Sequence, residues 1–141
     1  MTEVPAAISY LLIEDNRDHA LIIQNTIRRL NNHHRVSHID DGEKAIDYLK
    51  TSETADLPNI ILLDIKMPKK DGFEVLDFIR NHERLKHIPV IMLSTSSQKF
   101  EVMRAYKKGA NTYLSKPVRF NDFVNVIDNL NLYWSETAIM P

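Results

Sequence analysis

Short apolar runs alternate along the chain with longer segments whose apolar residues recur at helical spacing. The runs cover residues 8–13 (ISYLLI), 36–39, 59–63 (NIILL), 89–93 (PVIML) and 112–114 (TYL), of which the second is the most polar. Continuous apolar strands of this length are typical of a parallel sheet that is covered on both faces. The pattern therefore predicts five strands.

The segments between and after the runs predict five amphipathic helices. The first carries one apolar stripe formed by Ala20, Ile23, Ile27 and Leu30. The other stripes lie within residues 45–49, 75–79, 102–106 and 120–130. Turn residues separate the segments, at 41–42 and 71–72 (both Asp-Gly) and at 109 (Gly). We therefore expect a (βα)5 chain, an α/β fold in which right-handed crossovers give a three-layer sandwich around a five-stranded parallel sheet.

Composition limits the class of protein. With 141 residues, 43% of them hydrophobic, and a net charge of −1, the chain fits one domain spanning residues 1–141 and argues against a dedicated nucleic-acid binder. The absence of cysteine excludes disulfides and thiol chemistry. The uncharged stretch 4–13 is too short to span a bilayer and has no basic leader, so we expect a cytoplasmic protein without membrane contact. The segment 51–58 reads as a long connection and residues from about 133 as a short tail, with no output domain.

Residues that can do chemistry follow the predicted strands. Glu14 and Asp15 follow the first run, Asp64 the third, Ser94 the fourth and Lys116 the fifth. Ligands of open parallel sheets bind beyond the carboxyl ends of the strands, so these side chains are expected to meet. Taken singly, each has a simpler interpretation, since an Asp after a strand is usually a helix cap or a turn residue.

Together these residues predict a site for phosphoryl chemistry. Neighbouring carboxylates repel one another, and a hard divalent cation such as Mg²⁺ relieves that repulsion through oxygen ligands. A lysine and a cation can offset phosphate charge while one carboxylate attacks phosphorus. The set is thus suited to forming a phospho-aspartate.

These motifs resemble the receiver domains of two-component response regulators, the family of the bacterial chemotaxis response regulator. The matching segments span the domain: LLIEDN (11–16), IILLDIKMPKKDGFEVL (60–76), IPVIMLSTSS (88–97) and KKGANTYLSKPV (107–118). The resemblance implies a flavodoxin-like sheet with strand order 2-1-3-4-5. It also implies a phosphoprotein that works as a signalling switch, catalysing only its own phosphorylation and dephosphorylation.

The resemblance assigns roles residue by residue. It makes Asp64 the acceptor of phosphate from a sensor histidine kinase, Lys116 the phosphate-binding lysine and Ser94 the switch hydroxyl. Tyr113 resembles the aromatic residue that swings inward on activation, changing the surface of the fourth helix, fifth strand and fifth helix. Mg²⁺ would be held by Asp15, Asp64 and the backbone carbonyl of Lys66, with Glu14 acting through water.

A narrower resemblance concerns the partner kinase. The KKDG segment (69–72) and the end of the chain, YWSETAIMP (133–141), are similar to stand-alone receivers paired with bacterial phytochrome kinases. Such ends also occur in receivers that serve other histidine kinases, so both kinds of partner stay open.

Two other functions remain as alternatives to the switch. The first is an aspartyl-phosphate hydrolase of the haloacid dehalogenase type, which needs a second carboxylate two residues after the nucleophile. That position is Lys66 here, which counts against a hydrolase. The second is an interaction module that is never phosphorylated, and the complete set of site residues argues against it.

The charges of two predicted helices favour a homodimer. The fourth helix carries Lys99, Arg104, Lys107 and Lys108, and the fifth carries Asp122 and Asp128. A two-fold axis would bring each basic helix against the acidic helix of the partner, with Tyr133 and Trp134 adding apolar area. Ordinary solvated faces are the alternative.

The Lys116–Pro117 peptide bond is expected to be cis. A cis bond would turn the chain sharply after the fifth strand without a glycine, and the receiver resemblance implies the same.

Overall fold

The computed structural model describes residues 7–141 and confirms the five predicted strands and five helices. In chain order they are β1 (Ser9–Ile13), α1 (Arg17–Leu30), β2 (Arg35–Ile39), α2 (Gly42–Thr51), β3 (Ile60–Asp64), α3 (Gly72–Arg80), β4 (Val90–Ser94), α4 (Lys99–Lys107), β5 (Thr112–Ser115) and α5 (Phe120–Leu132). The strands pair in parallel, in the order β2-β1-β3-β4-β5. This arrangement confirms the flavodoxin-like α/β fold.

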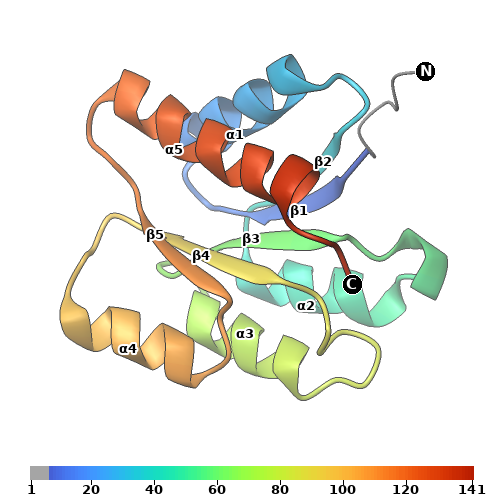
Figure 1. Ribbon diagram of the computed structural model, residues 1–141. Coiled ribbons are helices and arrows are strands. Elements are labelled where there is room, and N and C mark those ends of the chain that lie inside the picture. Colours follow the sequence, from blue (N-terminus) through green and yellow to red (C-terminus); the bar gives the residue numbers. More distant parts are fainter. Residues whose placement is uncertain (1–6) are drawn as a thin grey trace.

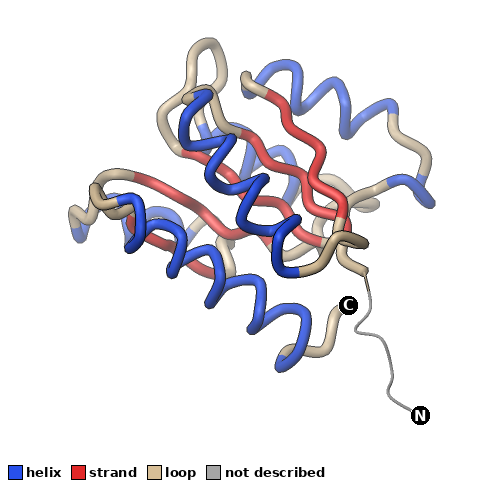
Figure 2. Tube along the Cα trace, turned by 90° about the horizontal axis from the view of Figure 1, so that it is seen from above, coloured by secondary structure: helices blue, strands red, loops and turns tan. Residues whose placement is uncertain are grey.

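The helices form two layers around the sheet. Figure 1 shows α1 and α5 side by side on one face, with α2, α3 and α4 on the other. Figure 2, seen from above, shows the strands running side by side between the helices. In the described part of the chain no helix is both long and apolar enough to cross a bilayer. Residues 4–6 of the uncharged stretch discussed above lie outside the described residues.

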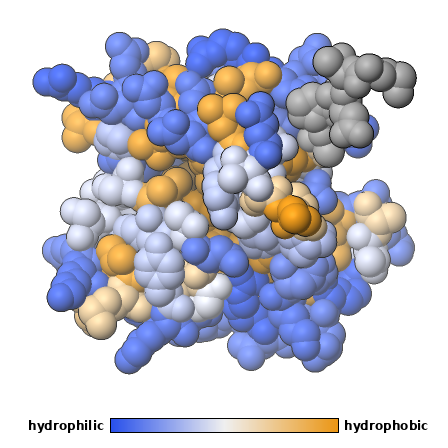
Figure 3. All heavy atoms as spheres, viewed as in Figure 1, coloured by the Kyte–Doolittle hydropathy of each residue, from blue (hydrophilic) through white to orange (hydrophobic). Residues whose placement is uncertain are grey.

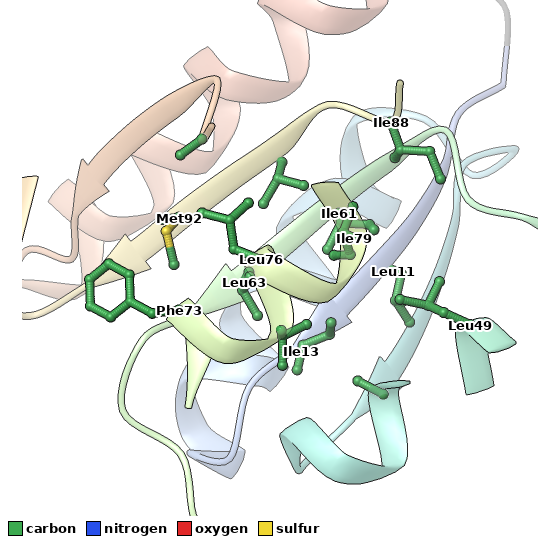
Figure 4. Packing of buried hydrophobic residues seen from close by; sticks show 14 of the residues in the cluster. Leu11, Ile13, Leu49, Ile61, Leu63, Phe73, Leu76, Ile79, Ile88 and Met92 are labelled. Carbon is green, nitrogen blue, oxygen red and sulfur yellow. The ribbon is translucent and has the colours of Figure 1, made fainter. Parts of the chain in front are cut away.

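Both faces of the central strands are buried, which explains why their sequences are continuously apolar. Successive residues of a strand point to opposite faces. Leu11 and Leu63 accordingly join the core under α2 and α3, which Figure 4 shows around Leu76 and Phe73. Leu12 and Leu62 join the second core, under α1 and α5. The sheet is thus held on both sides, and its strand ends are fixed relative to one another.

Helices α1, α2 and α3 are each preceded by an N-cap residue, which in the sequence lies in a turn or just before a helical stripe. Asn16, Asp41 and Asp71 each accept, through the side chain, a hydrogen bond from the backbone N–H three residues later. Glu74 returns the bond to the backbone N–H of Asp71, which completes a capping box. Each cap stabilises its helix by about 1 kcal/mol.

Two short segments add to the predicted pattern. The connection after α2 contains η1 (Thr54–Asp56), a single 3-10 turn. The predicted tail begins with η2 (Tyr133–Thr137), a π-helical continuation of α5 in which Ala138 N–H donates to Tyr133 O at 2.7 Å. Trp134 and Met140 pack against the core under α1 and α5. The end of the chain is therefore part of the folded body.

Candidate functional site

The register of the sheet brings the three predicted carboxylates together. Ile13 of β1 pairs with Leu63 of β3, so Glu14 lies beside Asp64, the last residue of β3. Oxygens of Glu14, Asp15 and Asp64 all lie within 4.8 Å of one another. Glu14 and Asp64 are buried, whereas Asp15 is exposed. One edge of the sheet thus carries an acidic cluster that is open to solvent on one side.

The hydroxyl and the lysine reach the same place from the other half of the sheet. Ser94 ends β4 and pairs with Ser115 of β5, so Lys116 follows directly. The backbone N–H of Lys116 donates to Ser94 O at 2.7 Å. A pocket of about 280 Å³ is lined by both residues together with Asp15, Asn16, His19, Asp64, Lys66 and Thr95. All the predicted strand-end residues except the enclosed Glu14 line this pocket.

The loop after Asp64 is held close to its own strand. Gly72 N–H donates to Ile65 O at 2.8 Å. A Cβ atom at Gly72 would lie 2.3 Å from the backbone oxygen of Asp64, so no larger residue fits there. The carboxylate itself accepts the N–H of Ile65 at 2.9 Å. These contacts fix Asp64 at the mouth of the pocket.

Lys116 links the acidic residues. Its ammonium donates a hydrogen bond to Glu14 Oε1 and lies 3.4 Å from Asp64 Oδ1. The lysine and Glu14 are both buried, so this is a buried ion pair rather than a surface contact. The positive charge of Lys116 therefore lies between the carboxylates of Glu14 and Asp64.

Lys116 alone does not balance the three carboxyl groups of the cluster. Burial and the neighbouring Glu14 carboxyl raise the pKa of Asp64 to about 7, even though Lys116 opposes the shift. Burial and the charge of Asp64 also raise the pKa of Asp15 above its ordinary value. The second oxygen of Glu14, Oε2, is buried without a hydrogen-bond partner in the described residues. A cation among these oxygens would favour the charged forms of Asp15 and Asp64 and would give the unpaired Glu14 oxygen a positive partner. The residues therefore fit a divalent cation.

Ser94 and Tyr113 are joined through one residue of the β4–α4 loop. The backbone N–H of Ser96 donates to Ser94 Oγ at 3.1 Å. The Tyr113 hydroxyl donates to the backbone oxygen of Ser96 at 2.7 Å. Tyr113 is half-buried here. The two residues predicted to act as a switch are thus connected by the peptide groups of Ser96.

His19 belongs to the site although no motif in the sequence predicts it there. It lies in the first turn of α1, and its Nδ1 is 3.2 Å from Lys116 Nζ and 3.3 Å from Glu14 Oε1. Burial and the charge of Lys116 lower the pKa of its ring. The only sequence signal was its position five residues after Glu14, behind the cap Asn16, and that spacing matches no common ligand motif.

The expectation of a cis bond before Pro117 is wrong, because the part of the chain that the structure describes contains no cis peptide bond. The reversal that the prediction assumed is not needed. The backbone of Lys116 continues the pairing with β4, and its long side chain alone spans the distance to Glu14 and Asp64.

Known proteins are similar to this chain in sequence and fold. Residues 10–128 match the response regulator receiver domain. The chain is 41% identical over 126 residues to the probable methanogenesis regulatory protein FilR2 of Methanothrix harundinacea, covering 88% of this chain and 81% of FilR2. It is 34% identical over 134 residues to the response regulator Rcp1 of Synechocystis, covering 93% and 91%.

Solved structures agree. The crystal structure of the phosphorylated cyanobacterial phytochrome response regulator RcpA superposes with a TM-score of 0.89 and 34% identity, covering 96% of this chain and 99% of RcpA. The Mn²⁺-bound form of Rcp1 superposes with a TM-score of 0.87 and 32% identity, covering 95% and 99%. Fold, strand-end residues and matched length all point the same way: the chain belongs to the response regulator receiver domains.

Proposed function

We propose that this protein is a response regulator that accepts a phosphoryl group from the phosphohistidine of a sensor histidine kinase onto Asp64, in a reaction that requires Mg²⁺. One observation carries the proposal. The Asp64 carboxylate lies at a solvent-open pocket, 3.4 Å from the Lys116 ammonium and within 4.8 Å of the Glu14 and Asp15 oxygens.

The geometry suits an in-line displacement at phosphorus. An oxygen of Asp64 attacks, the phosphorus–nitrogen bond of the donor breaks, and its electron pair stays on the imidazole nitrogen, which can then take up a proton. Lys116 offsets the charge of the phosphoryl oxygens. When bound, Mg²⁺ would be held by Asp15, Asp64 and the Lys66 backbone carbonyl, with Glu14 acting through water, and it would supply further positive charge to those oxygens. In the return reaction, a water molecule that enters the open pocket attacks phosphorus, the bond between phosphorus and the Asp64 oxygen breaks, and inorganic phosphate leaves. The protein thus catalyses only its own phosphorylation and dephosphorylation.

The output is a change of surface rather than a reaction on another molecule. A phosphoryl oxygen on Asp64 would accept a hydrogen bond from the Ser94 hydroxyl, and Tyr113 would turn inward as the Ser96 loop shifts. The affected surface comprises α4, β5 and α5. The match to almost the full length of Rcp1 supports a stand-alone regulator. We propose that it acts through this surface in the cytoplasm.

A phytochrome-type kinase is the first donor to test. RcpA is a phytochrome response regulator, and its structure matches nearly the whole of this chain. FilR2, at 41% identity, carries no such description, so a kinase of another sensory class is the comparison arm of that experiment. Phosphotransfer from each purified kinase to the protein, followed over the first minute, distinguishes the two.

We also propose a homodimer through α4, β5 and α5, but with fewer basic residues at the interface than the sequence predicts. Lys108 is paired with Asp77 of α3 and Arg104 lies over the Phe73 ring, so these two charges serve the fold. The exposed side chains of α4 that remain for a partner are Lys99, Phe100, Met103, Tyr106 and Lys107. Figure 3, which views the face bearing α4 and α5, shows hydrophobic residues in separate patches among hydrophilic ones. Light scattering of the beryllofluoride-treated protein should give twice the 16.4 kDa chain mass, and a monomer mass at high concentration would rule the dimer out.

Acetyl phosphate tests the phosphorylation directly. The wild-type protein with Mg²⁺ should gain the mass of one phosphate, and EDTA should prevent it. Asp64→Asn should gain none, because the attacking oxygen is replaced at nearly constant volume. Asp47→Asn is the matched control, since Asp47 is exposed on α2 away from the pocket. Phosphate retained by Asp64→Asn would refute the assignment of the acceptor.

A further inference from the structure

His19 contacts the buried ion pair from the side. Its Nδ1 lies 3.2 Å from Lys116 Nζ and 3.3 Å from Glu14 Oε1. Its ring packs against Phe123 of α5, with the ring centroids 5.4 Å apart and the planes tilted by 45°. Because α1 and α5 lie side by side (Figure 1), the ring is held between the two helices with one edge in the pocket that Asp64 lines.

The chemistry of the neighbours decides what this nitrogen does. The lysine ammonium has three N–H donors and no acceptor. Three atoms surround it in the structure: Glu14 Oε1, to which it donates, His19 Nδ1 at 3.2 Å and, as an ion-pair contact at 3.4 Å, Asp64 Oδ1. Because the ammonium cannot accept, the Lys116–His19 contact is a hydrogen bond in the tautomer whose ring proton is on Nε2, with Nδ1 as the acceptor. In the other tautomer, Nδ1–H would donate to Glu14 Oε1 at 3.3 Å instead. A role of His19 at the ammonium requires the first tautomer. His19 is the uncharged one of these three neighbours.

An uncharged acceptor can hold the ammonium when the two carboxylates are engaged in other interactions. Asp64 is the proposed acceptor of the phosphoryl group, and the free oxygen of Glu14 belongs to the cation cluster. Lysine has a flexible four-carbon stem, so an ammonium released by either carboxylate would sample many positions. A contact with His19 keeps it at the pocket whatever the two carboxylates bind.

On the basis of the proposed phosphoryl transfer, we propose that His19 is a positioning residue that holds the Lys116 ammonium in place for the incoming phosphoryl group. Holding the charge in advance lowers the cost of organising the site when the phosphoryl group arrives. The competing explanation is that His19 only fills space between α1 and Phe123.

Two substitutions separate these explanations. In His19→Asn, the amide oxygen branches from Cγ as Nδ1 does in histidine, so the acceptor is kept and most of the ring is lost. In His19→Leu, apolar volume is kept and the acceptor is lost. His87→Leu, at an exposed histidine before β4, controls for the loss of a histidine elsewhere.

The first measurement uses the protein without metal. In protein labelled with ¹³C-lysine, the Cε signal of Lys116, assigned with Lys116→Arg, should shift in His19→Leu and return toward the wild-type position in His19→Asn. The second measurement is the Kd for beryllofluoride with Mg²⁺. His19→Leu should raise it about five- to tenfold, as expected for the net contribution of one ordinary hydrogen bond, and His19→Asn should restore it to within about twofold of the wild-type value.

Each outcome decides a separate question. An unchanged Lys116 signal and Kd in His19→Leu would overturn the positioning role. Equal losses in His19→Leu and His19→Asn would overturn it in favour of packing, as would a loss that tracks lowered stability in urea unfolding. If the wild-type protein binds no beryllofluoride, the proposed function fails, and the Lys116 signal in the metal-free protein alone then confirms or refutes the contact with His19.

Discussion

Lys116 and Glu14 form a buried ion pair across 102 positions of sequence, between strands that are not neighbours in the sheet. β1 and β5 are separated by β3 and β4, so the lysine side chain crosses the ends of both to reach Glu14. On its way it passes Asp64, the last residue of β3. The pair therefore joins the two halves of the sheet at the place where the phosphoryl group is expected.

Removing one member of this pair should cost considerable stability. Lys116→Met leaves Glu14 buried without its cation, and loss of one partner of a buried pair costs about 3 kcal/mol. Adding Glu14→Gln removes the stranded charge and should recover most of the loss. Urea unfolding in EDTA measures both free energies of unfolding. If Lys116→Met is as stable as the wild type, the pair does not hold the charge of Glu14.

A second long-range contact should stabilise the other side of the sheet. The buried Tyr10 hydroxyl of β1 donates to Asn131 Oδ1 of α5 at 2.5 Å. Tyr10→Phe removes the donor and leaves the buried amide oxygen unpaired, so the free energy of unfolding should fall by about 1–3 kcal/mol. Thermal unfolding of Tyr10→Phe, compared with the double variant Tyr10→Phe/Asn131→Leu, tests this. The double variant should be the more stable of the two, and the reverse order would contradict the role of the hydrogen bond.

Most of the fold could be predicted because its signals are local. Apolar runs, helical stripes and the capping residues Asn16, Asp41 and Asp71 each act over a few positions. The π-helical segment at Tyr133 has no such signal, since it depends on how the end of the chain packs against the core.

The site was predictable for the same kind of reason, up to a limit. Strand-end residues converge in any parallel sheet, so Asp64 and Lys116 could be placed together from the pattern alone. His19 could not, because its contact with Lys116 spans 97 positions and depends on how α1 is rotated against Phe123. The prediction of a cis bond before Pro117 is wrong because the Lys116 side chain reaches the site without a reversal of the backbone.

His34 should make the stability depend on pH. Its buried ring accepts the backbone N–H of Ile8 at Nδ1, at 2.9 Å, and only the neutral ring can do so. Burial lowers the pKa of His34 in the folded state, with a smaller contribution from the adjacent His33, and the ring packs against Tyr10 in a T-shaped arrangement. Below an unfolded pKa of about 6.5 the unfolded chain takes up a proton first, so the free energy of unfolding should fall as the pH drops through that value.

The matched variant for this effect is His34→Asn, whose amide oxygen can still accept the Ile8 N–H. Urea unfolding at pH 7.5 and pH 5.5 should show a smaller loss in His34→Asn than in the wild type. The other five histidines are common to both proteins, so the difference between them isolates His34. Equal losses would show that this ring does not titrate in the unfolding reaction.

Ser94 should be dispensable for phosphorylation and required for its effect on the surface. Its Oγ accepts the Ser96 N–H at 3.1 Å, and the Ser96 oxygen accepts the Tyr113 hydroxyl at 2.7 Å. A phosphoryl oxygen that draws the Ser94 hydroxyl away would free the Ser96 amide and loosen the hold on Tyr113. Amide hydrogen exchange should therefore change in the β4–α4 loop and β5 when the wild type binds beryllofluoride. In Ser94→Ala, Asp64 should still gain one phosphate, but this change in exchange should be absent. Ser115→Ala, at the exposed end of the neighbouring strand, should respond as the wild type does. If Ser94→Ala also responds, the signal reaches Tyr113 without passing through the Ser94 hydroxyl.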